Sequence, residues 1–400
     1  MFSLIKKSIK KLHYKIPYKF RFIYDIFYSI YKKILNVSSA IYPIVIVIKE
    51  NNNEETNDIV FAYVGGRLSE KQFWGEKIFP NGFQEHFLGK HFFWNVKSCL
   101  KNANFGCSFI LSGSMFLTKL FSSPYFSFKI PHFMEMNLDL PPATEEFSKK
   151  LKAAFKDLQR RIRKHSLTCE ITRDPEKFEW FYHDMYVPYI KNRHSKTALI
   201  EEYDCAKDIF SRSDLFLIIK DNIPIAGHLL EYKKNSAIFH LLGIKDGDSK
   251  YLKYGISGVL DYFSILKLQK KGYKKTNKGG TRPFFNNGLT RYKLSFGAYV
   301  VKHSKVMNDC VSMILLDNIN KTREFLKNNA FVFFNERNQI SRALFIDPDQ
   351  FNTIEELKDY LKYNNCDGIV QSYIFLFYEN KKISSWLDSL AEQPFTIKLF

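Results

Sequence analysis

The sequence predicts an α/β fold with a mixed (α+β) sheet, chiefly because of the order of elements in residues 214–302. Apolar runs at 215–220 and 223–232 flank the turn residues Asp221 and Asn222, which predicts a β-hairpin. A third strand, a helix and a fourth strand follow this hairpin. Strands that alternate with a helix are typical of a sheet covered by helices.

The third strand is predicted at 236–244, and a polar loop at 245–250 separates it from the helix. The helix starts on small residues at 255–258 and ends at Gly272, a good C-terminal stop. Its first unpaired N–H groups and its positive dipole end suit a phosphate or pyrophosphate. An ordinary strand-to-helix turn has the same pattern, so this feature alone does not decide between the two.

The residues after this helix are the most characteristic of the chain. A strand at 273–280 leads into GGTRP at 279–283, and NGLTRYKLSFG follows at 287–297. With the IPIAG segment at 223–227, this order resembles the GNAT acyltransferase superfamily, and within it the FemAB-like branch of peptidoglycan aminoacyltransferases and envelope acyltransferases. The resemblance covers about residues 140–302 and implies a GNAT fold and an acyl-transfer reaction.

The phosphate loop departs from the usual GNAT motif. GNAT enzymes usually carry Gln/Arg-x-x-Gly-x-Gly/Ala, whereas the equivalent residues 252–257 are LKYGIS. The leading polar residue is absent. Its absence counts against CoA as the donor but not against the acyltransferase fold. The resemblance implies that the donor contacts the following residues: Lys253, Tyr254, Gly255, Ile256, Ser257 and Lys293.

Acyl transfer on such a scaffold needs a base for the proton of the acceptor and donors for the oxyanion. The resemblance places the acyl donor where two parallel strands splay apart, here those predicted at 236–244 and 273–280. His240 lies in the middle of the first. On the neighbouring strand, His228 and Glu231 are three residues apart and should lie on opposite faces.

The candidate catalytic residues are Glu231, His240 and His194, and a structural role stays open for each. Burial would raise the pKa of Glu231, which suits a base. In FemAB-like chains an arginine near the end of the helix predicted at 175–190 faces the acceptor pocket. The implied substrate-binding residues are Arg193, Arg282, Asn287 and Tyr292.

The chain divides into four predicted segments. These are a basic aromatic segment at 1–35, a degenerate GNAT-like unit at 36–140, the FemAB-like acyltransferase domain at 141–304 and an α/β extension at 305–400. The acyltransferase domain opens with a basic helix at 144–166, capped by Thr144, whose charged face either is solvated or contacts phosphates. The extension matches no family, and it could complete a sheet, form a lid or make a dimer contact.

Composition limits the partners. A chain of 400 residues with 45% apolar content can form a real core, as two domains or one duplicated domain. The net charge of +19 predicts attraction to polyanions such as nucleic acid, anionic lipid or phosphorylated carriers. The six cysteines are far apart and form no C-x-x-C pair, which predicts reduced thiols in the cytosol and no metal site.

The N-terminal segment 1–35 alternates Lys and Arg with aromatic and aliphatic residues and contains one acid, Asp25. The uncharged run at 34–48 is too short and too polar to span a bilayer, and no signal peptide is evident. The segment either lies on an anionic membrane surface or packs on its own domain.

The sequence therefore predicts a cytoplasmic FemAB-like GNAT N- or O-acyltransferase, with peripheral attachment to the inner membrane face left open. The expected donor is acyl-CoA, with aminoacyl-tRNA as the alternative. The expected acceptor is an amino- or hydroxyl-bearing sugar or a lipid-linked envelope precursor. A non-catalytic GNAT-like protein that binds RNA or membrane is a different possibility; its groove between the splayed strands could be filled by aromatic rings instead of being polar and open.

Overall fold

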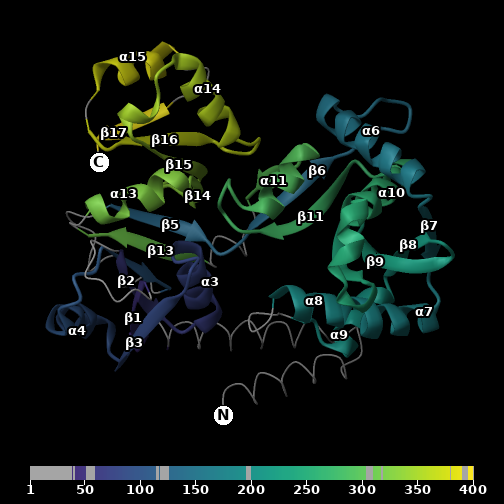
Figure 1. Cartoon of the computed structure of the whole chain (residues 1–400), viewed down its shortest axis with the longest axis horizontal. Helices are drawn as coiled ribbons and strands as arrows, with labels where there is room; N and C mark the ends of the chain where they lie inside the picture. The colour runs from purple at the N-terminus through teal and green to yellow at the C-terminus, as the bar shows by residue number, and fades with distance from the viewer. Residues whose placement is uncertain are drawn as a thin grey trace. The chain divides into compact units, whose positions relative to one another are not determined.

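The computed structural model describes residues 38, 41–50, 59–113, 117, 126–194, 200–302, 310–316, 319–378, 380–389 and 395–399 (Figure 1). These residues form two compact units. The first contains residues 135–280 and 292–299, and the second contains the described residues of 38–134, 281–291 and 300–399. Each unit is built on its own mixed sheet, so the predicted mixed α/β class is confirmed.

A seven-stranded sheet organises the first unit, in the order β12-β6-β11-β10-β9-β8-β7. Its strands are β6 (Met134–Asp139), β7 (Thr168–Thr172), β8 (Ser213–Lys220), β9 (Ile223–Tyr232), β10 (Ala237–Ile244), β11 (Lys275–Thr281) and β12 (Tyr299–Val301). The predicted hairpin is β8–β9, and its turn residues Asp221 and Asn222 have φ angles of 51° and 60°. Asp and Asn tolerate this left-handed conformation, which two-residue hairpin turns require.

Strands β10 and β11 separate soon after they pair. They run parallel and pair only at Ala237–Thr276 and Ile238–Asn277, whereas β10 stays paired with β9 as far as Ile244. The register of β10 shifts between His240 and Gly243, and Leu241 between them has a φ of 40°. This bulge and the early parting of the strands form the splay that the sequence predicts between these two strands.

Helices cover both faces of this sheet (Figure 1). On one face lie α6 (Lys149–Lys164) and α10 (Ile256–Lys270). On the other lie α7 (Pro175–Trp180), the π-helical segment Phe181–Tyr186, α8 (Val187–His194) and α9 (Tyr203–Phe210). The unit also contains the 3₁₀ segments η5 (Lys245–Gly247) and η6 (Ser249–Tyr254).

Helix α6 starts later than predicted. Ser148, not Thr144, is its N-cap, and the Ser148 hydroxyl accepts a hydrogen bond from the Leu151 N–H at 3.3 Å. The N–H of Glu145 bonds to the carbonyl of Pro142, so the residues after this proline form a turn instead of the first helical turn.

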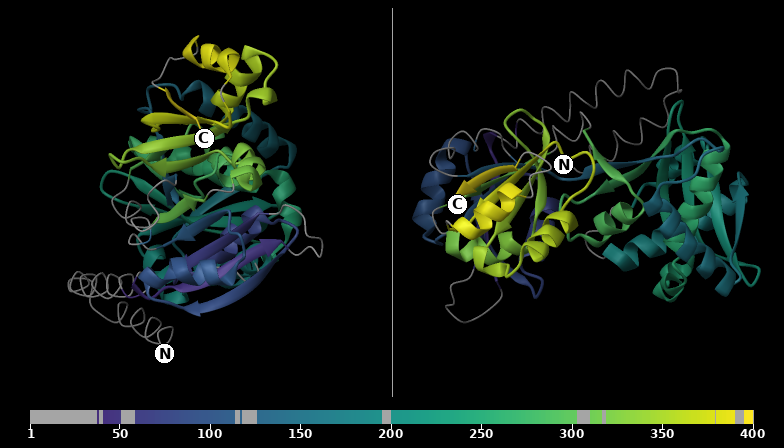
Figure 2. Two further views of the ribbon diagram at one scale, coloured as in Figure 1. Left: turned by 90° about the vertical axis from the view of Figure 1, so that its left-hand side faces the viewer. Right: turned by 90° about the horizontal axis from the view of Figure 1, so that it is seen from above.

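A ten-stranded sheet organises the second unit, in the order β17-β16-β15-β14-β5-β13-β4-β2-β1-β3 (Figure 2). Its strands are β1 (Ile44–Glu50), β2 (Val60–Gly65), β3 (Phe83–Lys90), β4 (Phe109–Ser112), β5 (Ser127–Pro131), β13 (Cys310–Leu315), β14 (Phe331–Phe334), β15 (Ile340–Ile346), β16 (Gln371–Leu376) and β17 (Phe395–Leu399). Strands from both ends of the chain thus share one sheet. Of the three roles considered for the C-terminal extension, completing a sheet is the one observed.

The helices of the second unit are α3 (Leu68–Ile78), η2 (Phe93–Asn95), α4 (Val96–Ala103), α13 (Ile319–Asn328), η7 (Pro348–Gln350), α14 (Ile354–Tyr363) and α15 (Lys381–Ser389). Helices α3 and α13 contribute residues to a core that is rich in phenylalanine and includes side chains of the sheet. Helix α11 (Gly288–Ser295) begins in this unit and ends in the first. None of the described helices combines the length and the apolar character needed to cross a membrane.

Candidate active site

Glu231 and His240 form a hydrogen-bonded pair next to the splay of β10 and β11. The Oε2 atom of Glu231 lies 3.0 Å from Nε2 of His240. Both side chains lie on the sheet face that α7–α9 cover, because His240 pairs with Leu229, which packs in the core cluster of that face. Glu231 is 3% exposed and His240 is 27% exposed, so the carboxylate is enclosed while the imidazole stays accessible.

Glu231 does not have the raised pKa that the sequence led us to expect. Burial favours a higher pKa, but hydrogen bonds from Lys233 and Arg212 outweigh burial and hold the pKa of Glu231 below its usual value. The Nε atom of Arg212 lies 2.9 Å from Oε1 of Glu231. An ionised carboxylate held by cations is a poor free base, and its geometry suits the orientation of His240.

The environment keeps His240 neutral near pH 7. Burial lowers its pKa below the usual value, and Glu231 only partly opposes this effect. With Nε2–H donating to the carboxylate of Glu231, the Nδ1 atom of the neutral ring carries the lone pair. A histidine in this state can accept a proton from an amine or hydroxyl.

His228 lies on the opposite face, as its spacing from Glu231 predicts. Its Nε2 atom lies 2.7 Å from the hydroxyl of Ser264 on α10, and the side chain is buried. Burial lowers its pKa to about 4. His228 is therefore a neutral core residue on the opposite face of the sheet from Glu231 and His240.

A buried polar cluster lies on the α10 face of the splay. Asp261 of α10 accepts from the ammonium of Lys278 on β11 and from the hydroxyl of Tyr292 on α11. The Lys278 ammonium also lies 4.2 Å from the ring centre of Phe239 and 5.3 Å from that of Phe296. This side of the splay therefore combines charged groups with aromatic rings. It matches neither the open polar groove expected of a catalyst nor the groove filled by aromatic rings that a non-catalytic binding protein could have.

Lys293 is buried beside this cluster. Its ammonium donates to the carbonyl oxygens of Gly279 and Gly280, each at 2.9 Å. Burial, followed by the nearby charge of Lys278, lowers the pKa of Lys293 to about 7. Lys293 thus contacts the end of β11, and its predicted contact with a donor phosphate or acceptor carboxylate stays a prediction.

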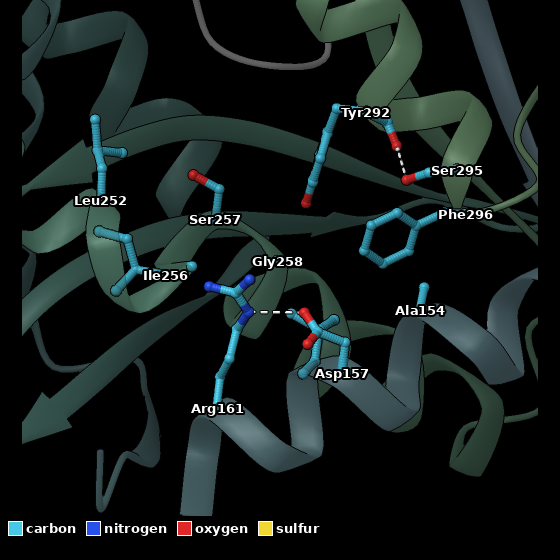
Figure 3. Close-up of a pocket in the computed structure, with 12 residues that line it drawn as sticks. Ala154, Asp157, Arg161, Leu252, Ile256, Ser257, Gly258, Tyr292, Ser295 and Phe296 are labelled. Carbon is cyan, nitrogen blue, oxygen red and sulfur yellow. Dashed lines mark hydrogen bonds and ion pairs between the residues drawn. The ribbon is translucent and has the colours of Figure 1, made fainter. Parts of the chain in front are cut away.

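A pocket of about 390 Å³ opens between α6, α10 and α11 (Figure 3). Figure 3 shows Arg161 and Asp157 extending from α6 toward the start of α10, with Tyr292 and Phe296 on the other side. The Nε atom of Arg161 lies 2.7 Å from Oδ2 of Asp157. Of the predicted donor and substrate residues, Gly255, Ile256, Ser257 and Tyr292 line this pocket.

Arg161 is the residue that sequence reasoning missed. A Cβ built on Gly255 would lie 3.0 Å from Cδ and 3.4 Å from Nη1 of Arg161, so the guanidinium lies against the first turn of α10. It occupies the same pocket as Leu252, where the usual motif has a polar residue. The basic helix was visible in the sequence, but nothing local indicates which of its cations contacts α10.

The predicted donor residues Lys253 and Tyr254, like Lys293, lie outside the pocket lining. The ring of Tyr254 packs against His165 with ring centres 4.8 Å apart, and the Lys253 ammonium lies 5.2 Å from the ring centre of Tyr254. Both residues belong to η6, whose C-cap is Gly255 with a φ of 71°. Contact between them and a donor stays a prediction.

Two predicted substrate residues have structural partners in the second unit. Nη1 of Arg282 lies 2.9 Å from Oε1 of Glu70, and its guanidinium lies between the rings of Phe73 and Phe133, at 3.7 and 4.3 Å. Asn287 accepts from the N–H groups of Leu289 and Thr290 and so caps the start of α11. Both residues thus have structural contacts, and their predicted contacts with a substrate stay predictions.

Arg193 and His194 lie at the end of α8. The exposed side chain of Arg193 donates to the hydroxyl of Tyr189 on the same helix. The side chain of His194 lies outside the described residues. The predicted acceptor contacts of both therefore stay predictions. Among the described side chains, no group of three His, Cys, Asp or Glu residues is placed to hold a metal ion.

No protein-family model and no curated protein matches the chain. Several solved structures are distantly similar. The C-terminal domain of a lysylphosphatidylglycerol synthetase candidate from Agrobacterium fabrum is 16% identical, with 73% of this chain and 89% of that one covered and a TM-score of 0.35. FemX is 11% identical, with 73% and 92% covered and a TM-score of 0.33. A GCN5-related N-acetyltransferase from Sphaerobacter thermophilus is 10% identical, with 66% and 74% covered and a TM-score of 0.30. Likeness at this level carries no argument about function.

Proposed function

We propose that this chain is a GNAT-like N- or O-acyltransferase. The observation that carries the proposal is the position of His240, which lies two residues after the last pair of β10 with β11 and is hydrogen-bonded to the ionised Glu231. A neutral, partly exposed imidazole oriented by a carboxylate at the opening of two strands has the properties of a general base.

The donor occupies the α10 face in this proposal. Its anionic part lies in the pocket beside Arg161 and the first turn of α10, where N–H groups and the guanidinium favour negative charge. Tyr292 and Phe296 line the pocket and also contact the Asp261 and Lys278 cluster at the splay, so the pocket leads toward β10. The acyl carbonyl then reaches the gap between the strands.

The acceptor approaches from the face of α7–α9, where His240 lies. Its amine or hydroxyl attacks the acyl carbon while His240 removes the proton, and a new C–N or C–O bond forms. The tetrahedral oxyanion collapses, the bond from carbon to the thiol sulfur or ester oxygen of the donor breaks, and the leaving group takes up a proton. N–H groups of β10 beyond Ile238, where pairing with β11 ends, are placed to stabilise the oxyanion.

We propose acyl-CoA as the donor, and an amino- or hydroxyl-bearing sugar or a lipid-linked envelope precursor as the acceptor. One observation favours aminoacyl-tRNA as a second candidate donor. Helix α6, which forms one wall of the pocket, carries exposed cations beyond Arg161, including Arg160, Arg163 and Lys164. A polyanion longer than CoA could use this surface.

The donor site can be tested by ligand-induced thermal stabilisation of purified protein with acetyl-CoA, longer acyl-CoAs and bulk tRNA. A ligand that binds only the native state raises Tm by mass action. Arg161→Gln should lose the shift with acyl-CoA, whereas the control Arg160→Gln should keep that shift, because Arg160 pairs with the same Asp157 but does not line the pocket. A shift with acyl-CoA at moderate salt supports the first donor, and a shift with tRNA that salt abolishes supports the second. Equal shifts in both variants would contradict this donor site.

A further inference from the structure

Three aromatic side chains form an exposed cluster on the second unit. Tyr42 precedes β1, and Phe92 and Trp94 follow β3. The rings of Phe92 and Trp94 are stacked with centres 4.7 Å apart, and Tyr42 lies 5.0 Å from Phe92. Their exposed fractions are 44%, 45% and 53% in chain order. We call these three residues the aromatic cluster.

The sheet register gathers this cluster at one end of three strands. Ile44 at the start of β1 pairs with Gly65 at the end of β2 and with Lys90 at the end of β3. The N–H of His91 donates to the carbonyl of Pro43, which joins the segment after β3 to the segment before β1. The cluster is therefore attached next to the paired ends of β1 and β3, and β3 is an edge strand of the sheet.

Exposed lysines lie close to the cluster in the sequence, whereas acidic residues do not. Lys90 is exposed at the end of β3, and Lys101 is exposed on α4. The sequence contains no Asp or Glu from residue 86 to residue 134. The buried side of α4 is formed by Val96, with Cys99 and Leu100 partly buried, so the helix turns its lysines outward.

We propose that the aromatic cluster and these lysines dock the protein on an anionic phospholipid surface. Tyr and Trp rings partition into the interfacial region of a bilayer, and lysines beside them attract anionic headgroups. Nucleic acid is less well matched, because the rings of Phe92 and Trp94 stack on each other and Tyr42 contacts Phe92, whereas stacking of bases needs free ring faces. This inference does not depend on the proposed reaction.

Vesicle flotation of the full-length protein tests this docking. Vesicles of phosphatidylcholine with about one third phosphatidylglycerol should bind the protein, and pure phosphatidylcholine vesicles should bind it far less. The double variant Phe92→Ser/Trp94→Ser should bind about tenfold more weakly. Lys90→Gln and Lys101→Gln should each weaken binding about fivefold, and added salt should reduce the binding of the wild type.

Matched controls separate docking from a general effect of apolar surface. Ile223→Ser on the β8–β9 hairpin and Leu289→Ser on α11 remove side chains that are each 46% exposed, close to the value for Phe92, and should leave binding unchanged. Brominated lipid should quench tryptophan fluorescence in the wild type but much less in Trp94→Phe, which keeps an aromatic ring. Unchanged vesicle affinity in a folded Phe92→Ser/Trp94→Ser protein would overturn the proposal. So would a loss of RNA binding in that variant with vesicle binding retained.

Discussion

At the scale of single residues, neighbouring groups set the protonation states of Glu231 and His240 in the candidate site. Glu231 is buried, which by itself would favour a neutral carboxyl, yet Lys233 and Arg212 keep it ionised. The ionised carboxylate fixes His240, whose pKa stays below its usual value because burial outweighs that attraction. In the proposed reaction Glu231 is therefore a positioning residue and His240 is the base.

His240→Gln should lower kcat/KM by about 10²–10⁴-fold, the usual contribution of a general base, while the fold stays intact. In the wild type the rate should fall as pH drops through the lowered pKa of His240, because the protonated ring cannot accept a proton. Glu231→Gln removes an interaction that raises this pKa, so the acidic limb of the pH–rate profile should move to lower pH. An unchanged turnover in His240→Gln would remove this residue from the mechanism.

The lowered pKa of Lys293 predicts that the stability of the fold depends on pH. Its pKa in the folded protein is about 7, below the value of an unfolded lysine, so the unfolded chain binds more protons between these two values. Stability should therefore rise as pH increases from about 7 toward 10, where the cost of burying the charge disappears. Lys293→Met should flatten this rise in thermal melts, whereas Lys275→Met, at an exposed site on β11, should keep it. A slope that survives in Lys293→Met would assign the effect to another group.

At the scale of elements, the start of α10 contacts Arg161 of α6, a helix that is distant in the sequence. Gly255 has a φ of 71° and ends η6 just before α10. Its missing Cβ leaves room for Arg161 of α6. The usual GNAT phosphate loop carries its polar side chain within the motif, whereas in the proposed donor site of this chain the cation comes from α6.

Gly255→Ala should destabilise the fold by about 1–2 kcal/mol, because an L side chain is strained at positive φ. It should also weaken donor binding, because the new Cβ would lie 3.0 Å from Cδ of Arg161. Gly272→Ala is the matched control, since Gly272 has a φ of 78° and no neighbour within 4 Å of a built Cβ. We expect both variants to lose a similar amount of stability, and only Gly255→Ala to lose the stabilisation induced by the donor. Equal donor-induced stabilisation in the two variants would refute a role for this contact.

At the scale of the whole molecule, the second unit depends on both ends of the chain. Strand β13 from the C-terminal part pairs with β4 on one side and with β5 on the other. Removing it would leave two buried strands without their neighbour and expose their unpaired backbone groups. The sheet can therefore be completed only when β13 is present beside β4 and β5.

A chain that ends at residue 304 lacks β13–β17 and should not fold cooperatively in its second unit. Circular dichroism melts and size-exclusion chromatography should show aggregation or loss of the main transition. The full-length protein provides the reference. A monodisperse truncated protein that melts cooperatively, with β4 and β5 protected in hydrogen exchange, would show that the extension is dispensable.

Local rules allowed part of the fold to be predicted from the sequence. Turn preference placed Asp221 and Asn222 in the β8–β9 hairpin, and Gly272 ended α10, because these conformations depend on adjacent residues. The alternation of a strand placed His228 and Glu231 on opposite faces for the same reason. The sequence by itself therefore determined the order of elements around the splay and the position of His240 within it.

Only the tertiary structure decided which distant residues meet. The direction of the pKa shift of Glu231 depends on Arg212 from the segment after α9, and the cation of the pocket is Arg161 from α6. The shared sheet of residues 44–131 and 310–399 likewise joins parts of the chain that no local pattern connects. Such contacts are set by how faces of helices and sheets pack, and sequence spacing specifies the faces but not their partners.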